Sequence, residues 1–411
     1  MRSVALASVM LVAATALAAQ SKPRARDLGV PFDGTPGPNN AITDVGSVMV
    51  GHTTLISGNG AIVVGKGPVR TGVTALLPRG KDAKHPVFAA WFSLNGNGEM
   101  TGTTWVQESG FLAGPVIITN TNSVGVARDA VVAWQLKANP EADWSLPVVA
   151  ETYDGMLNDI NGFHVKPADV WNAIETAKDG RVAEGSVGGG TGMICNGFKG
   201  GIGTSSRVAP KEAGGYTVGV LVQCNYGGVR GLRIAGAPVG KDVPTPPMCM
   251  AGSLEPSSPF LRGMKKCAGS PSSMVERPNP EMGSIIIVIA TDAPLLPSQL
   301  QRVVKRAALG IGREGGIASN YSGDIFIAFS TANLDAARSD TSVVNVTMMP
   351  NEKMDILFIM TVLATEEAIT NAMVAAETMV GADSLRVEGL PHKWLQETLK
   401  KYNRLDSTAT R

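Results

Sequence analysis

Charge of either sign is scarce in this chain, and the two signs nearly cancel. Only 17% of the 411 residues are charged, with 36 Lys and Arg against 35 Asp and Glu. Proteins that bind nucleic acids usually carry a basic surplus or a basic stripe, because they must neutralise phosphates. Neither is visible, so nucleic acid is not an expected partner, and small neutral or singly charged substrates fit better.

Long apolar runs are absent from most of the sequence. The exception is residues 1–19, where Arg2 precedes an apolar stretch that ends in small residues, the form of a secretory signal. That stretch is too short for a membrane span, and no later window is expected to supply the roughly 20 apolar residues that a span needs. We therefore expect an exported protein, periplasmic or secreted, without a membrane partner.

Cysteine and histidine are rare, with four of each. The cysteines show no CxxC spacing and no histidine-rich neighbourhood, which argues against a zinc site, and no metal or other cofactor is expected. The dispersed histidines form no recognisable Ser-His-Asp arrangement. Cys249 and Cys267 share one Pro/Ser-rich segment and are candidates for a disulfide in an oxidising compartment, although their spacing fits two free thiols equally well.

Glycine is abundant, and it divides the amino-terminal part into short elements. From residue 42 to 119 we expect strands and glycine turns, including the apolar runs 61–64 and 115–119. Apolar residues at helical spacing predict helices around 124–134 and 167–180. The chain is large and apolar enough to bury a sizeable core.

A change of composition separates two parts of the chain. Residues 237–283 are rich in Pro, Ser and Gly without an apolar period, as in a linker. We expect residues 20–283 and 284–411 to be two segments of one domain. The expected elements that follow the linker are strands at 284–291, 324–330 and 342–347, a helix at 298–310 begun by a Ser298–Gln301 capping box, and a helix at 361–380.

Gly283 and Ser284 stand where the linker meets a strand. Glycine adopts backbone angles that other residues resist, and Ser284 places a hydroxyl next to the glycine carbonyl. An N-to-O acyl shift followed by hydrolysis would make Ser284 a new amino terminus, whose amine, with an ordinary pKa of about 8, could serve as a general base. Taken alone, the pair also fits an ordinary turn before a strand.

Four further motifs accompany this junction: the segments 95–102, 187–193, 198–207 and 290–297. Together with Gly283–Ser284 they resemble the L-aminopeptidase D-Ala-esterase/amidase (DmpA) family, which includes the β-peptidyl aminopeptidases. The resemblance covers nearly all of the chain after residue 19. It implies an α+β fold, a four-layer αββα sandwich of the N-terminal-nucleophile-hydrolase type shared with the ornithine acetyltransferases. It also implies cleavage before a serine and assembly of the processed pairs into homo-oligomers, commonly tetramers.

The resemblance assigns roles to individual residues. Ser284 matches the nucleophile, and Asn225, at the end of an expected strand 216–224, matches a donor to the oxyanion. Ser322 and Asp324 match a second serine and an acidic partner that orient the new amine. Related enzymes carry Glu at the position of Asp324, so its carboxylate reaches one methylene less far.

Two more residues match positions that line the family's pocket. Glu151 is the first candidate to bind a substrate ammonium, with Asp324 as the second, because a desolvated carboxylate binds a cation through charge-assisted hydrogen bonds. Tyr153 could donate its hydroxyl near the oxyanion or the leaving group. Without the resemblance, Glu151 would fit a solvated surface position and Tyr153 the edge of the core equally well.

The function expected from these residues is a self-cleaving serine aminopeptidase or amidase. It would release the N-terminal residue of short peptides, amides or esters through an acyl-enzyme on Ser284. An acyltransferase of the ornithine acetyltransferase type is a rival, disfavoured because those enzymes use Thr as the nucleophile. A non-catalytic exported binding protein is a second rival. The glycine-rich run 188–203 lacks the Lys-Ser/Thr pair of a phosphate loop, so we expect its glycines to let backbone segments pass close to the nucleophile.

Overall fold

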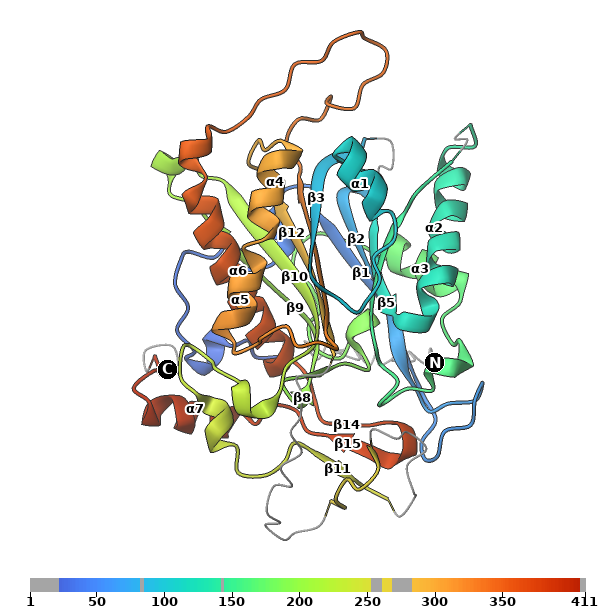
Figure 1. Ribbon diagram of the computed structural model, residues 1–411, viewed down its shortest axis with the longest axis vertical. Coiled ribbons are helices and arrows are strands. Elements are labelled where there is room, and N and C mark those ends of the chain that lie inside the picture. The colour runs from blue at the N-terminus through green and yellow to red at the C-terminus, as the bar shows by residue number, and fades with distance from the viewer. Residues whose placement is uncertain (1–21, 82–84, 142–143, 253–260, 268–282, 407–411) are drawn as a thin grey trace, which may run out of the picture.

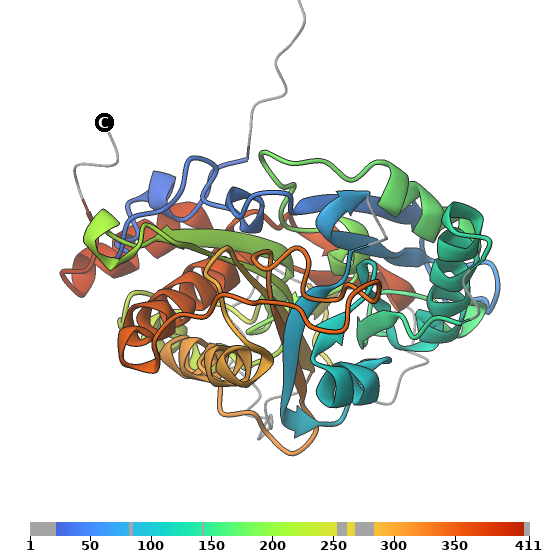
Figure 2. The same cartoon turned by 90° about the horizontal axis from the view of Figure 1, so that it is seen from above.

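The computed structural model describes residues 22–81, 85–141, 144–252, 261–267 and 283–406. Two β-sheets lie face to face between helices, in four layers (Figures 1 and 2). The helices within these residues are α1 Thr103–Ser109, α2 Val124–Ala138, α3 Pro167–Glu175, α4 Pro297–Val304, α5 Ala307–Arg313, α6 Asp355–Val374 and α7 His392–Lys401.

The larger sheet has six strands in the order β4-β3-β13-β12-β10-β9. Their bounds are β3 Val87–Gly96, β4 Phe111–Leu112, β9 Gly201–Val208, β10 Thr217–Asn225, β12 Ser284–Thr291 and β13 Gly323–Ser330. Strand β12 lies antiparallel to β10 and parallel to β13. Every residue of β10, β12 and β13 is buried, which explains why these strands read as nearly continuous apolar runs.

The smaller stacked sheet has the order β1-β2-β5-β6. Its strands are β1 Met49–Ser57, β2 Val69–Lys81, β5 Val116–Asn120 and β6 Val148–Thr152. Two small sheets complete the described strands, formed by β7 Ile194–Cys195 with β8 Phe198–Lys199, and by β11 Met248–Met250, β14 Met379–Val380 and β15 Leu385–Val387.

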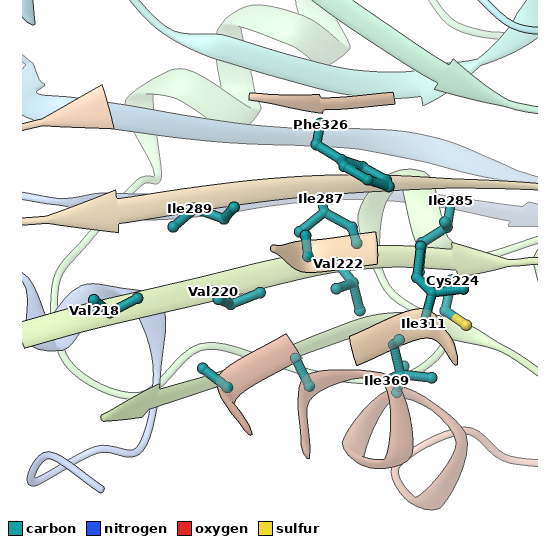
Figure 3. Close-up of a cluster of buried hydrophobic side chains, with 14 of the residues drawn as sticks. Val218, Val220, Val222, Cys224, Ile285, Ile287, Ile289, Ile311, Phe326 and Ile369 are labelled. Atoms are coloured by element: carbon teal, nitrogen blue, oxygen red, sulfur yellow. The ribbon is translucent and has the colours of Figure 1, made fainter. Parts of the chain in front are cut away.

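Alternation along β12 separates two of the buried cores. Ile285, Ile287 and Ile289 pack toward α4, α5 and α6 (Figure 3). Ile286 and Val288 point the other way and pack between the two sheets. A third core joins the outer face of the smaller sheet to α2 and α3. The layers therefore run helix, sheet, sheet, helix, which confirms the expected αββα fold of the α+β class.

Helix α6 is long and apolar enough to cross a membrane by length and composition. Its mean hydropathy over an 18-residue window is 1.4, so the expectation that no window after residue 19 is apolar enough for a membrane span was wrong. Most of the helix is nevertheless buried in the fold, where it packs against β9 and β10. The stretch is therefore a core helix in this fold, because a helix that is apolar all round is normally found in a core or a membrane.

Several predicted elements differ from the structure. Residues 342–347 form no strand: they belong to an extended arm, residues 331–350, the orange-red loop that rises from the body in Figure 1. Val343 and Val346 are exposed there. Their β-branched side chains favour an extended backbone, but none of the described strands pairs with them. Likewise, residues 61–64 are a turn whose Val63 and Val64 face solvent.

The two long helices of the carboxyl-terminal segment also have different limits. The expected helix 298–310 is split into α4 and α5, and the cap is Leu296, whose N–H donates to Gln299 Oε1 at 3.1 Å. The predicted Ser298–Gln301 capping box is therefore wrong. The break sets α5 against α6: a Cβ at Gly310 would lie 2.6 Å from Thr365 Cβ. Helix α6 begins at Asp355 and ends at Val374, so residues 361–380 are helical only in part.

Candidate active site

Ser284 is the first residue of β12, and it lies directly opposite Asn225, the last residue of β10. Cross-strand partners project from the same face of a sheet, here the face between the two sheets. Each residue is only 6% exposed. The structure therefore places the predicted nucleophile beside the predicted oxyanion donor, at one end of the layer between the sheets.

The backbone at Gly283 leaves room for no other residue. Its φ is +106°, in the region that favours glycine. A Cβ there would lie 1.8 Å from the Asn225 carbonyl oxygen and 3.4 Å from Asn225 Nδ2. The peptide bond before Ser284 is thus held close to Asn225 by contacts that only glycine permits.

The hydroxyl of Ser284 has a backbone donor on its other side. Gly323 N–H donates to Ser284 Oγ at 3.1 Å. A Cβ at Gly323 would meet the Asn97 carbonyl oxygen at 2.4 Å and Ser284 Oγ at 2.9 Å, so glycine is required here as well. The sequence predicts no role for Gly323, because a backbone donor has no signature in side-chain chemistry.

Ser322 and Asp324 lie on either side of Gly323 and contact each other. Ser322 Oγ donates to Asp324 Oδ1 at 2.6 Å, and both residues are fully buried. Asp324 aligns with Ile285 rather than with Ser284, so alternation directs its side chain to the face opposite the Ser284 hydroxyl. The two side chains form a pair, and the observed contact with the Ser284 hydroxyl comes from the Gly323 N–H between them.

The amide of Asn225 is fixed at both ends. Its Oδ1 accepts from Ile194 N–H at 2.8 Å, and its Nδ2 donates to the Tyr153 carbonyl oxygen at 2.9 Å. These bonds define which end of the amide is the donor. Within the part of the chain that the structure describes, the second N–H of Asn225 Nδ2 has no hydrogen-bond partner.

Glu151 lies on β6, in the other sheet, and is 3% exposed. Its carboxylate accepts from Glu99 N–H at 3.0 Å and from the Thr121 hydroxyl. A Cβ at Gly98 would lie 3.2 Å from Glu151 Oε1 and 3.3 Å from Gly323 Cα, so only glycine backbone separates the carboxylate from β13. Burial is the main cause that raises the pKa of Glu151, and the charge of Glu99 adds to it, while the two hydrogen bonds oppose the rise.

Tyr153 follows Glu151 and contacts the site through its backbone. Its carbonyl accepts from Asn225, whereas the residue as a whole is 40% exposed and its hydroxyl lies over Gly155, where a Cβ would come within 2.4 Å of it. Partial burial, followed by the charge of Asp154, raises the pKa of the Tyr153 hydroxyl. The geometry shows a role in positioning Asn225 that the sequence did not indicate.

Two motifs that are far apart in sequence meet beside the nucleophile. Asn97 N–H donates to the Ser322 carbonyl at 3.3 Å, and Asn97 Nδ2 donates to the Tyr321 carbonyl at 2.9 Å. Segment 95–102 therefore supports the loop that presents Gly323. The family resemblance includes both segment 95–102 and the residues Ser322 and Asp324, and their joint presence was the signal that could have indicated this contact.

The structure contains two disulfides. One joins Cys249 to Cys267, the candidate pair of the sequence analysis. The other joins Cys195 to Cys224, a pair that was not predicted. Within the described residues, no three His, Cys, Asp or Glu side chains form a group that could hold a metal ion.

Comparison with known sequences places the chain among aminopeptidases. The model of the family described as "Peptidase family S58" matches residues 40–387 of this chain. A β-peptidyl aminopeptidase BapA of Sphingosinicella microcystinivorans is 55% identical over 401 residues, covering 98% of this chain and 97% of the relative. A second protein of that name, from Sphingosinicella xenopeptidilytica, is 46% identical and covers 96% of this chain and 95% of its own.

Comparison with solved structures gives the same result. The L-aminopeptidase D-Ala-esterase/amidase of Ochrobactrum anthropi is described as a prototype of the serine aminopeptidases and a variant of the N-terminal-nucleophile hydrolase fold. It superposes with a TM-score of 0.81 at 45% identity, over 93% of this chain and 100% of its own. The chain described here therefore belongs to peptidase family S58 and is an aminopeptidase with the N-terminal-nucleophile hydrolase fold.

Proposed function

We propose that this aminopeptidase is made as one chain and cleaves itself between Gly283 and Ser284. The observation that carries the proposal is the placement of Ser284, preceded by a glycine in the left-handed region and facing Asn225 across the strand pair. In the cleavage, Ser284 Oγ attacks the Gly283 carbonyl carbon, and the amide nitrogen leaves with the hydroxyl proton. This acyl shift frees the Ser284 amine, and water then hydrolyses the resulting ester, which releases the Gly283 carboxylate and the Ser284 hydroxyl.

In turnover, the Ser284 amine acts as the base for its own hydroxyl. The hydroxyl attacks the substrate carbonyl, the amine takes the proton and passes it to the leaving group, and an acyl-enzyme forms on Ser284. The free N–H of Asn225 stabilises the oxyanion, a contribution of about 3 to 4 kcal/mol for a typical preorganised donor. The Ser322 hydroxyl, ordered by Asp324, orients the amine.

Glu151 is the proposed ligand of the substrate ammonium. It is buried, and no Lys, Arg or His lies within ion-pair distance of it among the residues that the structure describes. A bound ammonium would supply the missing positive charge. Asp324 points to the other face of the sheet, which favours Glu151 over it in this role.

The substrates proposed are short peptides, amides or esters with an N-terminal β-amino residue. Two relatives at 55% and 46% identity carry the name β-peptidyl aminopeptidase, which supports this choice over α-amino residues. A panel of matched α-, β- and D-aminoacyl nitroanilides measures the preference. Faster hydrolysis of every α-aminoacyl compound than of its β-counterpart would contradict the choice.

Export and self-association are also part of the proposal. Residues 1–19 resemble a secretory signal, and the arm 331–350 exposes Leu334, Val343 and Met348 to solvent. Exposed apolar side chains on an extended arm suit burial against a second copy of the chain. Light scattering of the chain and of a variant with these three residues changed to Ser tests the assembly. If both proteins have the same mass in solution, the arm does not contribute to the assembly.

The catalytic proposal is tested by substitution of the nucleophile. Ser284→Ala should abolish both scission and hydrolysis, whereas Ser284→Cys should keep part of the scission, because a thiol is also a nucleophile. Scission is followed by gel electrophoresis and hydrolysis with an aminoacyl nitroanilide. Hydrolysis by Ser284→Ala at the parental rate would overturn the assignment and favour another nucleophile.

A further inference from the structure

Lys199 is an unusual residue for the interior of this protein. Its side chain is fully buried, and no carboxylate lies within ion-pair distance of it in the described residues. Instead, its Nζ donates to two backbone carbonyls, Met193 O at 2.7 Å and Gly200 O at 2.9 Å. A buried amine without a charged partner is costly, and an apolar side chain would fill the same space without that cost.

The first of these carbonyls is connected to the proposed oxyanion donor. The Met193 carbonyl and the Ile194 N–H belong to one peptide group. The carbonyl accepts from Lys199, and the N–H donates to Asn225 Oδ1 at 2.8 Å. A continuous series of hydrogen bonds thus runs from Lys199 Nζ through this peptide to the Asn225 amide.

Hydrogen bonds in such a series strengthen one another. An amine on the Met193 carbonyl withdraws electron density from the peptide, which makes Ile194 N–H a stronger donor to Asn225 Oδ1. Donation to Oδ1 in turn makes the Nδ2–H groups of Asn225 stronger donors. The effect is greatest where negative charge develops on the substrate oxygen, that is, in the transition state.

The surrounding chain holds this series in place. Residues 193–200 form the β7–β8 hairpin, and the Cys195–Cys224 disulfide joins the residue after Ile194 to the residue before Asn225. Asn196 N–H also donates to the Tyr226 carbonyl at 2.6 Å. The hairpin is therefore fixed to the end of β10 on both sides of the Ile194–Asn225 bond.

We propose that Lys199 is a positioning residue for catalysis, which orients and polarises Asn225 through the Met193–Ile194 peptide. This inference rests on the proposed oxyanion role of Asn225. It also explains one glycine of the run 188–203. A Cβ at Gly200 would meet the Cys224 carbonyl at 2.4 Å and Cys195 Cβ at 2.7 Å, so glycine at this position lets the hairpin lie against the end of β10. Burial lowers the pKa of Lys199 to about 7, consistent with an amine held away from water.

The test is a double-mutant cycle of Lys199→Met and Asn225→Ala. Turnover is measured per processed chain, with processing quantified from the fragment that begins at Ser284. Lys199→Met should lower kcat about five- to tenfold and change KM less than about twofold, a smaller loss than the 10²- to 10³-fold typical for removal of an oxyanion donor. In the Asn225→Ala background, Lys199→Met should have almost no effect, because its action passes through Asn225.

Three outcomes contradict the inference in distinguishable ways. If Lys199→Met has an unchanged kcat while Asn225→Ala is impaired, Lys199 does not polarise Asn225, and the oxyanion role of Asn225 is retained. An equal loss in both backgrounds indicates a purely structural role for Lys199. Full turnover of Asn225→Ala overturns the oxyanion role itself, and the inference with it.

A control and a second measurement cover poor folding or slow processing. Lys211→Met changes an exposed lysine in the β9–β10 connection, at the end of β10 away from Asn225, and should leave kcat and KM unchanged. Lys199→Gln retains an uncharged donor and should lose less than Lys199→Met. On the processed Lys199→Met chain, an aminoalkyl boronate, which forms a tetrahedral anion on Ser284, should bind about five- to tenfold more weakly than to the parent, while the free amino acid binds equally well. Equal boronate affinity would overturn the inference.

Discussion

Two buried glutamates, Glu151 and Glu367, have opposite electrostatic environments. Glu367 is fully buried on α6, and it accepts from Arg26 at 2.8 Å, Arg207 at 2.7 Å and Asn40 at 2.6 Å. Burial favours the neutral form of Glu367, but the bonds from Arg26 and the charges of both arginines outweigh it, so its pKa is lowered. Among the described residues, the donors to Glu151 are all neutral, and its pKa is raised.

The difference separates a structural carboxylate from one suited to a ligand. Glu367 ties the amino-terminal segment and β9 to α6, and its charge is already compensated within the fold. Glu151 is held ready by a backbone N–H and a hydroxyl, but its charge is compensated only when a cation arrives. A perturbed buried acid near a nucleophile is a marker of function, whereas a fully paired one marks the scaffold.

The largest effect is expected from Glu367→Gln, and it should fall on stability. Loss of this carboxylate leaves Arg207 buried with its main counter-charge removed, which costs about 3–5 kcal/mol. Urea unfolding followed by circular dichroism gives the change, and turnover per folded molecule should remain near the parental value. Glu377→Gln, which removes an exposed partner of Lys22, is the control and should change stability by less than about 1 kcal/mol. If Glu367→Gln lowers the free energy of unfolding no more than Glu377→Gln does, the ion pair with Arg207 does not stabilise the fold.

A smaller effect, on catalysis, is expected from Glu151→Gln. Loss of a charge-assisted hydrogen bond of about 1.5–3 kcal/mol should lower kcat/KM for aminoacyl nitroanilides about 10- to 100-fold. Stability should stay the same or rise, because an uncompensated buried charge is removed. An acyl nitroanilide without the amino group provides the comparison, since parent and variant should hydrolyse it equally slowly. The same loss on both substrates would show that Glu151 does not recognise the ammonium.

The smallest effect is a difference in the pH dependence of stability. Because the folded pKa of Glu151 is raised above the unfolded value, the folded state binds the proton more tightly. The resulting stabilisation is present at acidic pH and is lost as pH rises through the folded pKa, with a slope of at most about 1.4 kcal/mol per pH unit. Thermal unfolding of parent and Glu151→Gln between pH 4 and 8 should show this loss only in the parent. Parallel curves would mean that Glu151 ionises as freely as in the unfolded chain.

The sequence was sufficient to predict site residues that lie at the end of a regular strand. Ser284 precedes one apolar run and Asn225 follows another, and each run is typical of a buried strand. The prediction that both residues lie at strand ends was correct. The four-layer fold followed from the family resemblance and from the strands of the carboxyl-terminal segment. The strand predicted at 342–347 was wrong because β-propensity reports a preference for extended backbone, not the presence of a pairing partner.

The rest depended on contacts between distant segments. Glu367 and Arg207 are 160 positions apart, and nothing in the local sequence distinguishes them from solvated surface charges. Likewise, nothing in the sequence around Lys199 distinguishes it from an exposed lysine, because its burial results from the packing of the hairpin against β10. The Cys195–Cys224 pair and the Gly323 donor are also products of the fold, since one needs two segments to meet and the other is a backbone atom.

The most direct measurement is the intact mass and amino-terminal sequence of the purified, active protein. We expect two chains, one of which begins Ser284-Ile285-Ile286-Ile287, with activity that rises in proportion to this fragment. An active preparation that consists entirely of the uncleaved chain would contradict it, because Ser284 would then have no free amine to accept the proton.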